Sequence, residues 1–374
     1  MASETFIVIG AGPAGSFLAY NLAKAGCKVL VFEEHESAGL PVHCTGLFTE
    51  KIKDYVNLSD EFLVNTLSSV EIHTQNSKVL LKSNEYVVNR AKFDEYLHKE
   101  AESLGVKYYF NHKLSSYEKR GSSLQLVFET PNGVEKFDCS TIIGCDGPLS
   151  KVNELFNMNP KGEFYLGKQF LIKTSIKKIS CYGVFFGGEL SDFFGWIVPV
   201  DNTHIKIGVG STIHSLVNKK LRSIRKSLNI KGKVVEVNAG LIPIYNPYRE
   251  IYKKIGRFNV YLMGDAAGFV KATSGGGVIP SFSAITECYK NIIHGEYPKL
   301  PKTRRELLSH LIIRRVMTKL SDSEWDMLIK DFDDKRVRYI ISRQNRDNLL
   351  KLALELVKSK PYLLKYARFL PKMF

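Results

Sequence analysis

The stretch Thr5-Phe-Ile-Val-Ile-Gly-Ala-Gly-Pro-Ala-Gly15 decides how this chain begins to fold. Its apolar run over 5–9 predicts a buried strand, and the glycines that follow predict a tight turn. Helical spacing over 16–25 and a second apolar run over 28–32 complete a strand–helix–strand unit of about 30 residues. The spacing G-x-G-x-x-G in this context is typical of dinucleotide-binding folds.

Each glycine of this turn has a physical task of its own. Gly10 permits the sharp turn, Gly12 lets the backbone approach a pyrophosphate, and Gly15 allows the helix to pack closely on the strand. The free N–H groups at the start of the helix then face the phosphates. Glu33 ends the second strand, where a carboxylate accepts hydrogen bonds from ribose hydroxyls and disfavours a 2′-phosphate.

Two later turns favour FAD over NAD as the dinucleotide. Cys145-Asp146-Gly147 follows one apolar strand, and Gly264-Asp265-Ala-Ala-Gly268 follows another. An aspartate after such a strand can bind a ribityl hydroxyl, and a glycine-rich helix start can face a phosphate or a flavin. The sequence therefore predicts three distant turns that converge on one FAD.

Strand and helix patterns alternate through the first half of the chain. Two paired strands are predicted over 70–88 and a helix over 90–104. Three further strands are predicted over 106–137, joined by hairpin turns at Gly121-Ser122 and Asn132-Gly133.

The second half is first β-rich and then helical. Aromatic-rich strands are predicted from 161 to 259, apart from a helix over 216–228, and helices follow from 280 onwards. We therefore predict an α/β (α+β) fold with a Rossmann-like FAD-binding domain, a β-sheet-rich substrate domain and a C-terminal helical segment. The predicted boundaries are 1–160 and 258–298 for the FAD-binding domain, 161–257 for the substrate domain and 299–374 for the helical segment.

The composition is that of a globular protein with excess positive charge. The 374 residues are 44% apolar and 24% charged, with a formal net charge of +15 and a pI near 9.3. This balance favours anionic partners, yet no nucleic-acid-binding motif is present. No pair of cysteines has C-x-x-C spacing, and no apolar run reaches the roughly 18 residues of a membrane span. We expect a cytoplasmic protein without a signal peptide or a metal site.

The three turns resemble those of the large family of FAD flavoproteins that includes the aromatic hydroxylases. The resemblance implies that the pyrophosphate and then the rest of the cofactor are contacted by Gly10, Gly12, Ala14, Gly15, Asp146 and, at the ribitol, Asp265. Asn89-Arg90-Ala-Lys-Phe93-Asp94 matches the family's helix start, in which the arginine approaches the cofactor. A backbone group near Leu114 would contact the adenine.

Two stretches resemble a narrower group, the geranylgeranyl reductases. These stretches are Pro41-Val-His-Cys44-Thr45-Gly46 and the segment from Gly264 to Val278. The resemblance implies a reductase that saturates isoprenoid double bonds, chiefly in archaeal membrane ether lipids. It also implies that Cys44, Thr45 and Gly46 contact the flavin, with Cys44 as the candidate catalytic residue that donates a proton, shapes the pocket or packs there.

The group's substrate motif, Pro-x-x-Tyr-x-Trp-x-Phe-Pro, is only partly matched. Here the stretch is Ser191-Asp-Phe-Phe194-Gly-Trp196-Ile-Val198-Pro199, so the tyrosine hydroxyl is lost while an aromatic face remains. The departure leaves the lipid channel and the exact substrate open. The expected substrate contacts are Phe185, Phe194, Trp196 and Pro199, and further apolar lining is expected from Phe186 and Phe193.

The run Gly275-Gly276-Gly277 predicts a backbone that lies against the flavin ring. The helix that begins at Val278 would point its N-terminus at the flavin N1–O2 edge and stabilise the anionic reduced form. Reduction of an isolated alkene then needs close placement, a hydride from flavin N5 and a proton donor. We expect the FAD to be reduced by NAD(P)H or a ferredoxin-like donor protein.

The C-terminal stretch bears on location. Apolar residues of 349–357 follow helical spacing, and lysines and arginines are interspersed to the end of the chain. Such a helix suits peripheral binding to the inner face of the cell membrane, or packs on the protein. Alternative functions are an aromatic monooxygenase, a quinone side-chain reductase or a non-catalytic nucleotide-binding protein of the membrane surface.

Overall fold

The computed structural model describes residues 5–120, 123–343 and 347–369. Its strands are β1 (Thr5–Ile9), β2 (Lys28–Phe32), β3 (Leu47–Thr49), β4 (Leu63–His73), β5 (Lys78–Val88), β6 (Lys107–Tyr109), β7 (Lys113–Arg120), β8 (Ser123–Thr130), β9 (Gly133–Cys139), β10 (Thr141–Gly144), β11 (Phe164–Lys173), β12 (Cys181–Phe185), β13 (Gly195–Asp201), β14 (His204–Ser211), β15 (Lys233–Pro243), β16 (Tyr252–Ile255) and β17 (Phe258–Leu262). The α-helices are α1 (Pro13–Lys24), α2 (Arg90–Glu102), α3 (Lys151–Leu155), α4 (Val217–Ser227), α5 (Val278–Ile293), α6 (Pro301–Met317), α7 (Asp322–Phe332), α8 (Lys335–Arg343) and α9 (Leu349–Ser359). Short 3-10 helices are η1 (Glu50–Asp54), η2 (Gly188–Leu190), η3 (His214–Leu216), η4 (Gly264–Ala267) and η5 (Pro361–Phe369).

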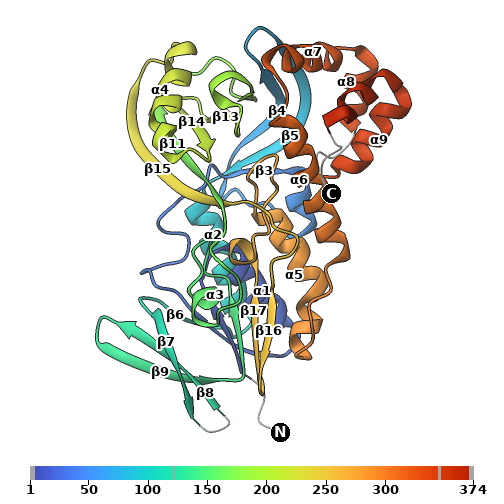
Figure 1. Ribbon diagram of the computed structural model, residues 1–374. Helices are drawn as coiled ribbons and strands as arrows, with labels where there is room; N and C mark the ends of the chain where they lie inside the picture. The colour runs from blue at the N-terminus through green and yellow to red at the C-terminus, as the bar shows by residue number, and fades with distance from the viewer. Residues whose placement is uncertain (1–4, 121–122, 344–346, 370–374) are drawn as a thin grey trace.

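A six-stranded sheet carries the predicted strand–helix–strand unit. Its order is β16-β17-β10-β1-β2-β6, and every neighbouring pair is parallel except β16 with β17. Phe32 of β2 stacks on Phe128 of the three-stranded sheet β7-β8-β9, with ring centroids 4.2 Å apart. Figure 1 shows this smaller sheet beside the lower end of the six-stranded one. The Rossmann-like domain is confirmed, and the predicted turn at Gly121-Ser122 lies outside the described residues.

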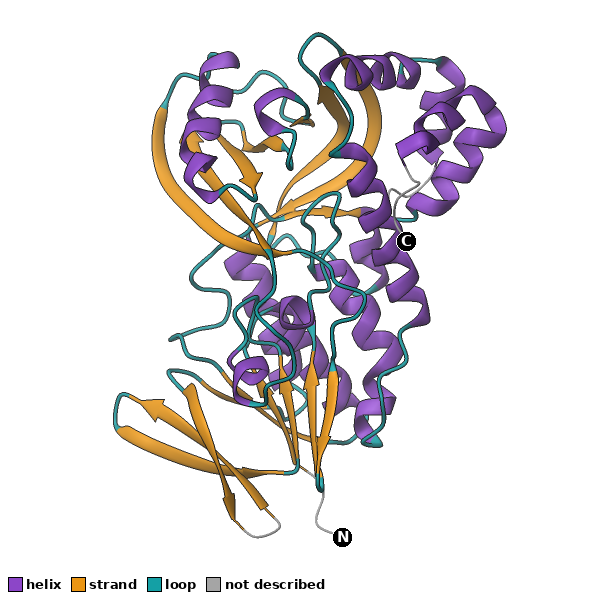
Figure 2. Cartoon of the chain, viewed as in Figure 1, coloured by secondary structure: helices purple, strands orange, loops and turns teal. Residues whose placement is uncertain are grey.

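An eight-stranded sheet forms the second half of the molecule. Its order is β15-β11-β14-β13-β12-β4-β5-β3, and β4 runs parallel to β12 while the other neighbours are antiparallel. The sheet curves over the six-stranded one in Figure 2. Three of its strands come from residues 47–88, which the sequence prediction had placed with the FAD-binding domain. They join the strands of 164–243 through a single pairing, that of β4 with β12.

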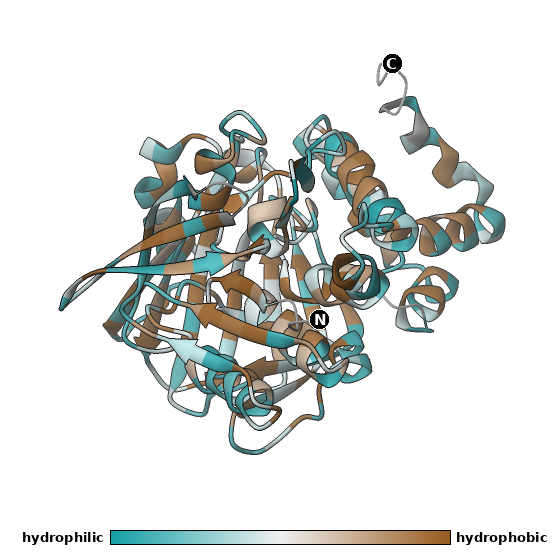
Figure 3. Ribbon diagram, turned by 90° about the horizontal axis from the view of Figure 1, so that it is seen from below, coloured by the Kyte–Doolittle hydropathy of each residue, from teal (hydrophilic) through white to brown (hydrophobic). Residues whose placement is uncertain are grey.

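Helices cover both faces of the eight-stranded sheet. On one face, Leu221 and Ile224 of α4 pack against Ile207 of β14. On the other face, Ile329 of α7 packs against Val70 of β4. The predicted C-terminal helical segment is present as α6 to α9. Figure 3 shows both apolar and polar residues along the helices at one side of the molecule. Across the described residues, none of the helices combines the length and the apolar character needed to cross a membrane.

Candidate active site

The first glycine turn leaves an uncovered patch of backbone. A Cβ added to Gly10 would lie 2.5 Å from the Cys145 carbonyl oxygen, and one on Gly15 would lie 1.9 Å from that of Gly10. Around a Cβ on Gly12, in contrast, there is no heavy atom within 4 Å. Gly12 also begins α1 without a side-chain cap, so the N–H groups of the first turn face open space. The turn therefore offers a cradle for an anionic group.

Glu33 joins this turn to the end of β2. Its Oε2 accepts a hydrogen bond from the Ala11 N–H at 2.8 Å, and its Oε1 accepts one from the His35 N–H at 3.1 Å. The carboxylate borders the same cavity as Gly12. A ribose next to the pyrophosphate cradle would meet this carboxylate.

Asp146 closes the second turn from the side of β10. Its Oδ2 accepts a hydrogen bond from the Val152 N–H at 3.0 Å, which ties the turn to α3. Its Oδ1 is buried and has no hydrogen-bond partner among the described residues. Burial raises the pKa of this carboxyl. This acceptor is therefore available for a hydrogen bond from a bound group or a water molecule.

Asp265 closes the third turn, directly after β17. Its carboxylate borders the cavity and accepts no hydrogen bond from the residues that the structure describes. A Cβ on Gly277 would lie 2.6 Å from Asp265 Oδ1, so only glycine fits opposite this side chain. Burial raises the pKa of the Asp265 carboxyl to about 6. A ribityl hydroxyl would provide the donor that the protein itself does not.

The raised pKa predicts how pH affects the FAD-free protein. Between pH 3.8, the ordinary Asp value, and about 6, folded Asp265 keeps a proton that the unfolded chain has lost. The free energy of unfolding therefore falls as pH rises through this window, by about 1–3 kcal/mol from this group. Urea unfolding across the window should show a smaller fall for Asp265→Asn. The exposed Asp60→Asn is the control, and an unchanged fall in Asp265→Asn would contradict the assignment.

The loop from Lys271 to Gly277 places the third turn against the eight-stranded sheet. The Gly275 N–H donates to the Lys271 carbonyl oxygen at 2.8 Å, and the Lys271 N–H donates to that of Gly276 at 3.1 Å. A Cβ on Gly275 would lie 3.4 Å from Phe193 Cζ. Helix α5 then begins at Val278 with no side-chain cap at Gly277. Gly277 and Val278 at its start line the cavity.

The loop that carries Cys44 is bound to the eight-stranded sheet by hydrogen bonds. The Thr45 hydroxyl donates to Gln169 Oε1 at 2.8 Å, and Lys206 Nζ donates to the Thr45 carbonyl oxygen at 2.7 Å. The Cys44 sulfur accepts a hydrogen bond from the Gly46 N–H at 3.4 Å and another from the Arg90 side chain. Arg90 in turn pairs with Asp94 at 3.0 Å. Cys44 is thus fixed at the cavity wall as a hydrogen-bond acceptor.

All three turns, the Cys44 loop and the start of α5 line one cavity of about 1530 Å³. Leu114 and Arg90 border it as well. Gly15 and Gly46 do not line it; a Cβ on Gly46 would lie 2.4 Å from the Val88 carbonyl oxygen, so this glycine serves backbone packing. The remaining predicted cofactor residues are brought together, from segments separated by more than 200 positions.

The eight-stranded sheet gives the same cavity an apolar wall. Phe186, Phe193, Phe194 and Trp196 line it, as do Val184 and Val198. The predicted contacts Phe185 and Pro199 do not, because alternate residues of a strand face opposite sides. Phe185 instead stacks on His73, with ring centroids 4.7 Å apart.

Comparison with known proteins agrees with this geometry. Residues 3–182 match the family model of an FAD binding domain. The digeranylgeranylglycerophospholipid reductase of Methanococcus vannielii is 25% identical over 97% of each chain, and that of Methanocaldococcus jannaschii is 24% identical over 96% of each. A solved geranylgeranyl bacteriochlorophyll reductase-like protein from Thermoplasma acidophilum superposes with a TM-score of 0.79 at 19% identity, covering 99% of this chain and 100% of that one.

This chain is similar over nearly its whole length to digeranylgeranylglycerophospholipid reductases, and its first half matches an FAD binding domain. It is an FAD-dependent oxidoreductase, and its own residues fit the cofactor. Gly12 offers the backbone approach, α1 and α5 begin without caps, and Asp146 and Asp265 each present an acceptor that lacks a donor. These groups match the phosphates, the flavin edge and the hydroxyls of FAD.

The C-terminal helices supply a wall of the cavity that the sequence analysis did not predict. Apolar side chains of α6 to α9 line the cavity opposite the sheet: Ile313, Met317, Trp325, Leu328, Ile329, Phe332, Ile341, Leu349, Leu352 and Leu356. Within the apolar pattern over 349–357, the side chains of Leu349, Leu352 and Leu356 line the cavity. Of the two alternatives for that spacing, packing on the protein accounts for this face of α9.

Proposed function

We propose that this flavoprotein saturates isoprenoid double bonds, with the geranylgeranyl chains of membrane ether lipids as substrates. The observation that carries the proposal is the continuity of one cavity from the FAD-binding turns to a chamber with apolar walls on two sides. At about 1530 Å³ it exceeds the roughly 300–1,000 Å³ of ordinary small-molecule sites. The names of the relatives support a prenyl lipid as the second occupant.

Different residues of the chain would bind the cofactor, position the substrate and exclude water in such a reaction. Reduced FAD, when bound, supplies a hydride at flavin N5. Gly12 and the start of α1 bind the pyrophosphate, Asp265 holds the ribitol, and the start of α5 stabilises negative charge at the flavin edge. Phe194 and Trp196 position the chain, and the helices on the far wall exclude water.

Cys44 is proposed as a residue that touches the flavin. Its sulfur accepts hydrogen bonds from the Gly46 N–H and from Arg90, so the side chain is already oriented as an acceptor. That orientation favours holding the cofactor edge over giving away a proton. Cys44→Ala is expected to weaken FAD binding and to shift the visible flavin spectrum, because a polar contact beside the ring is lost. A variant with unchanged affinity and spectrum would remove Cys44 from the site.

The number of dinucleotide-binding turns bears on which donor reduces the FAD. The sequence contains a single G-x-G-x-x-G turn. We propose that NAD(P)H or a ferredoxin-like protein reduces the FAD without a separate nicotinamide-binding domain.

Peripheral binding to the inner face of the cell membrane is proposed as the route to the substrate. Leu350 and Leu354 lie one turn apart on α9 and are 49% and 54% exposed, and Lys351 and Lys358 are exposed on the same helix. Exposed apolar and basic side chains together suit an anionic lipid surface. Co-sedimentation with anionic vesicles should fall on Leu354→Glu, and equal sedimentation would refute this route.

Mass spectrometry of the lipid tests the function directly. The FAD-loaded protein is reduced chemically without oxygen and mixed with an unsaturated ether phospholipid. We expect a gain of about two daltons per reduced double bond together with reoxidation of the flavin. A protein that oxidises only with oxygen present and returns a hydroxylated product would be a monooxygenase, and an unchanged lipid would refute the proposal.

A further inference from the structure

A strip of five buried polar side chains crosses the apolar wall of the cavity. Every member lines the cavity, and their exposed fractions are only 1–6%. The strip, from the middle of the sheet to the glycine loop, consists of Tyr182, Glu85, Thr49, Asp347 and Lys271. None of them belongs to the cofactor turns described above. The mechanism proposed so far assigns no role to these five side chains.

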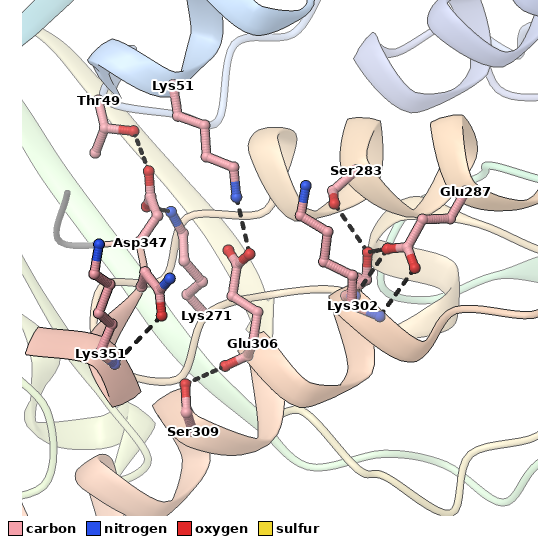
Figure 4. Close-up of polar contacts among 12 residues, drawn as sticks. Thr49, Lys51, Lys271, Ser283, Glu287, Lys302, Glu306, Ser309, Asp347 and Lys351 are labelled. Carbon is pink, nitrogen blue, oxygen red and sulfur yellow. Dashed lines mark hydrogen bonds and ion pairs between the residues drawn. The ribbon is translucent and has the colours of Figure 1, made fainter. Parts of the chain in front are cut away.

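The strip divides into two hydrogen-bonded groups. In the first, the Tyr182 hydroxyl donates to Glu85 Oε1 at 2.7 Å, and the Ser83 hydroxyl donates to the same oxygen at 2.8 Å. In the second, the Thr49 hydroxyl donates to Asp347 Oδ2 at 2.6 Å, and Lys271 forms an ion pair with the other oxygen of Asp347. Figure 4 shows Thr49, Asp347 and Lys271 converging from three separate segments.

Strand register joins the two groups. Thr49 of β3 and Glu85 of β5 are direct partners in an antiparallel pair. Directly opposed residues point to the same face, with Cβ atoms about 4.5–5.5 Å apart. At the other end, Lys271 Cε lies 3.5 Å from where a Cβ on Gly276 would be. The strip therefore extends from the flavin-facing glycines to Tyr182.

Stability alone does not account for these residues. Burying ionisable groups costs free energy, and apolar side chains of similar size pack as well or better. The immediate surroundings are apolar, since Tyr182 belongs to the cluster that contains Leu67, Val87 and Val198. Their position on the wall of the reaction chamber makes these residues candidates for a part in the reaction.

We propose that Tyr182 is the proton donor of the reduction and that Glu85 orients its hydroxyl by accepting a hydrogen bond from it. This inference rests on the proposed function, in which one alkene carbon receives a hydride, with its two electrons, from the reduced flavin. The other carbon forms its C–H bond with the proton of Tyr182 as the O–H bond breaks. The phenolate then regains a proton from a solvent water that enters the cavity between turnovers, and hydroxide leaves to bulk solvent.

The geometry assigns this step to Tyr182 in preference to Cys44. The Tyr182 hydroxyl is a hydrogen-bond donor at the cavity wall, whereas the Cys44 sulfur accepts hydrogen bonds from Gly46 and Arg90. Tyr182 also shares its strand face with Val184 and Phe186, which line the chamber for the chain. Tyr182 therefore borders the space where the alkene would lie, and rotation of its O–H bond away from Glu85 would present the proton there.

Single turnover without oxygen tests the inference. Dithionite-reduced, FAD-loaded Tyr182→Phe is mixed with the unsaturated lipid, and flavin reoxidation is followed by absorbance. We expect a rate about 100-fold lower than that of the wild type, the loss typical of a missing general acid. In D2O the wild type should add solvent deuterium to one face of the alkene, and the residual reaction of the variant should lose that facial preference. Glu85→Gln should also slow the reaction, because an amide can turn its N–H toward the Tyr182 oxygen and remove the acceptor that orients the hydroxyl.

Tyr86→Phe is the matched control. Tyr86 follows Glu85 on β5, is buried and does not line the cavity. It should react at the wild-type rate, and all variants should retain wild-type FAD affinity and melting temperature. Equal rates and equal facial preference in Tyr182→Phe and the wild type would overturn this inference alone. A wild type that reduces no prenyl lipid would overturn the proposed function and this inference with it.

Discussion

Gly12→Val is expected to abolish FAD binding while leaving the FAD-free protein as stable as the wild type. The backbone of Gly12 has φ −69° and ψ −177°, which any residue adopts, and an added Cβ meets no heavy atom within 4 Å. The new side chain would occupy only the space that the pyrophosphate needs. We expect affinity to fall at least about 100-fold, or about 2.8 kcal/mol, by fluorescence titration.

Gly15→Ala is the contrasting variant of the same turn. Its Cβ would lie 1.9 Å from the Gly10 carbonyl oxygen, so the turn itself must move. We expect the FAD-free protein to lose about 3 kcal/mol of stability, as overpacked sites do. If Gly12→Val destabilised the FAD-free protein as much as Gly15→Ala, or bound FAD normally, the cradle would not be where we place it.

Arg314→Met is expected to destabilise the protein by about 3–5 kcal/mol and to weaken FAD binding at the same time. Arg314 is 3% exposed and donates to the carbonyl oxygens of Ala272 and Thr273, each at 2.8 Å, and of Phe193 at 3.2 Å. Its guanidinium also lies 4.7 Å from the centroid of the Phe193 ring. One side chain from α6 thus holds the glycine loop against the aromatic wall.

Removal of Arg314 leaves buried carbonyl groups without donors, which costs more than the bonds themselves contribute. Burial lowers the pKa of Arg314 to about 10, so the guanidinium still carries its charge at neutral pH. Arg314→Lys keeps a charge but lacks the planar fork, and should fall between wild type and Arg314→Met. The exposed neighbour Arg315→Met is the control. Urea unfolding and FAD titration that gave the same values for both methionine variants would refute this role.

Local spacing was sufficient to predict the cofactor half of the site. The turn Gly10–Gly15, Glu33 directly after β2 and Asp265 after β17 each depend on residues a few positions apart. Glycines that must lie close to another backbone, and aspartates at strand ends, leave a signal within one short segment. The structure gathers these segments at one edge of a parallel sheet, as such a sheet requires.

Strand register decided which aromatic residues face the substrate. Phe185 and Phe186 are adjacent and chemically identical, and only pairing with β4 and β13 determines that Phe186 lines the cavity. A shift of one residue would exchange them. Composition could therefore predict an aromatic wall without predicting its members.

The sequence by itself determined a flavin-binding fold, because glycine spacing and apolar periodicity are local properties of the chain. Only the tertiary structure decided that residues 47–88 complete the second sheet and that α6 to α9 close the cavity. It alone also brought together Thr49, Glu85, Tyr182, Lys271 and Asp347, which share no motif. Contacts between isolated positions far apart in sequence depend on how whole elements pack, and no short window of sequence records that packing.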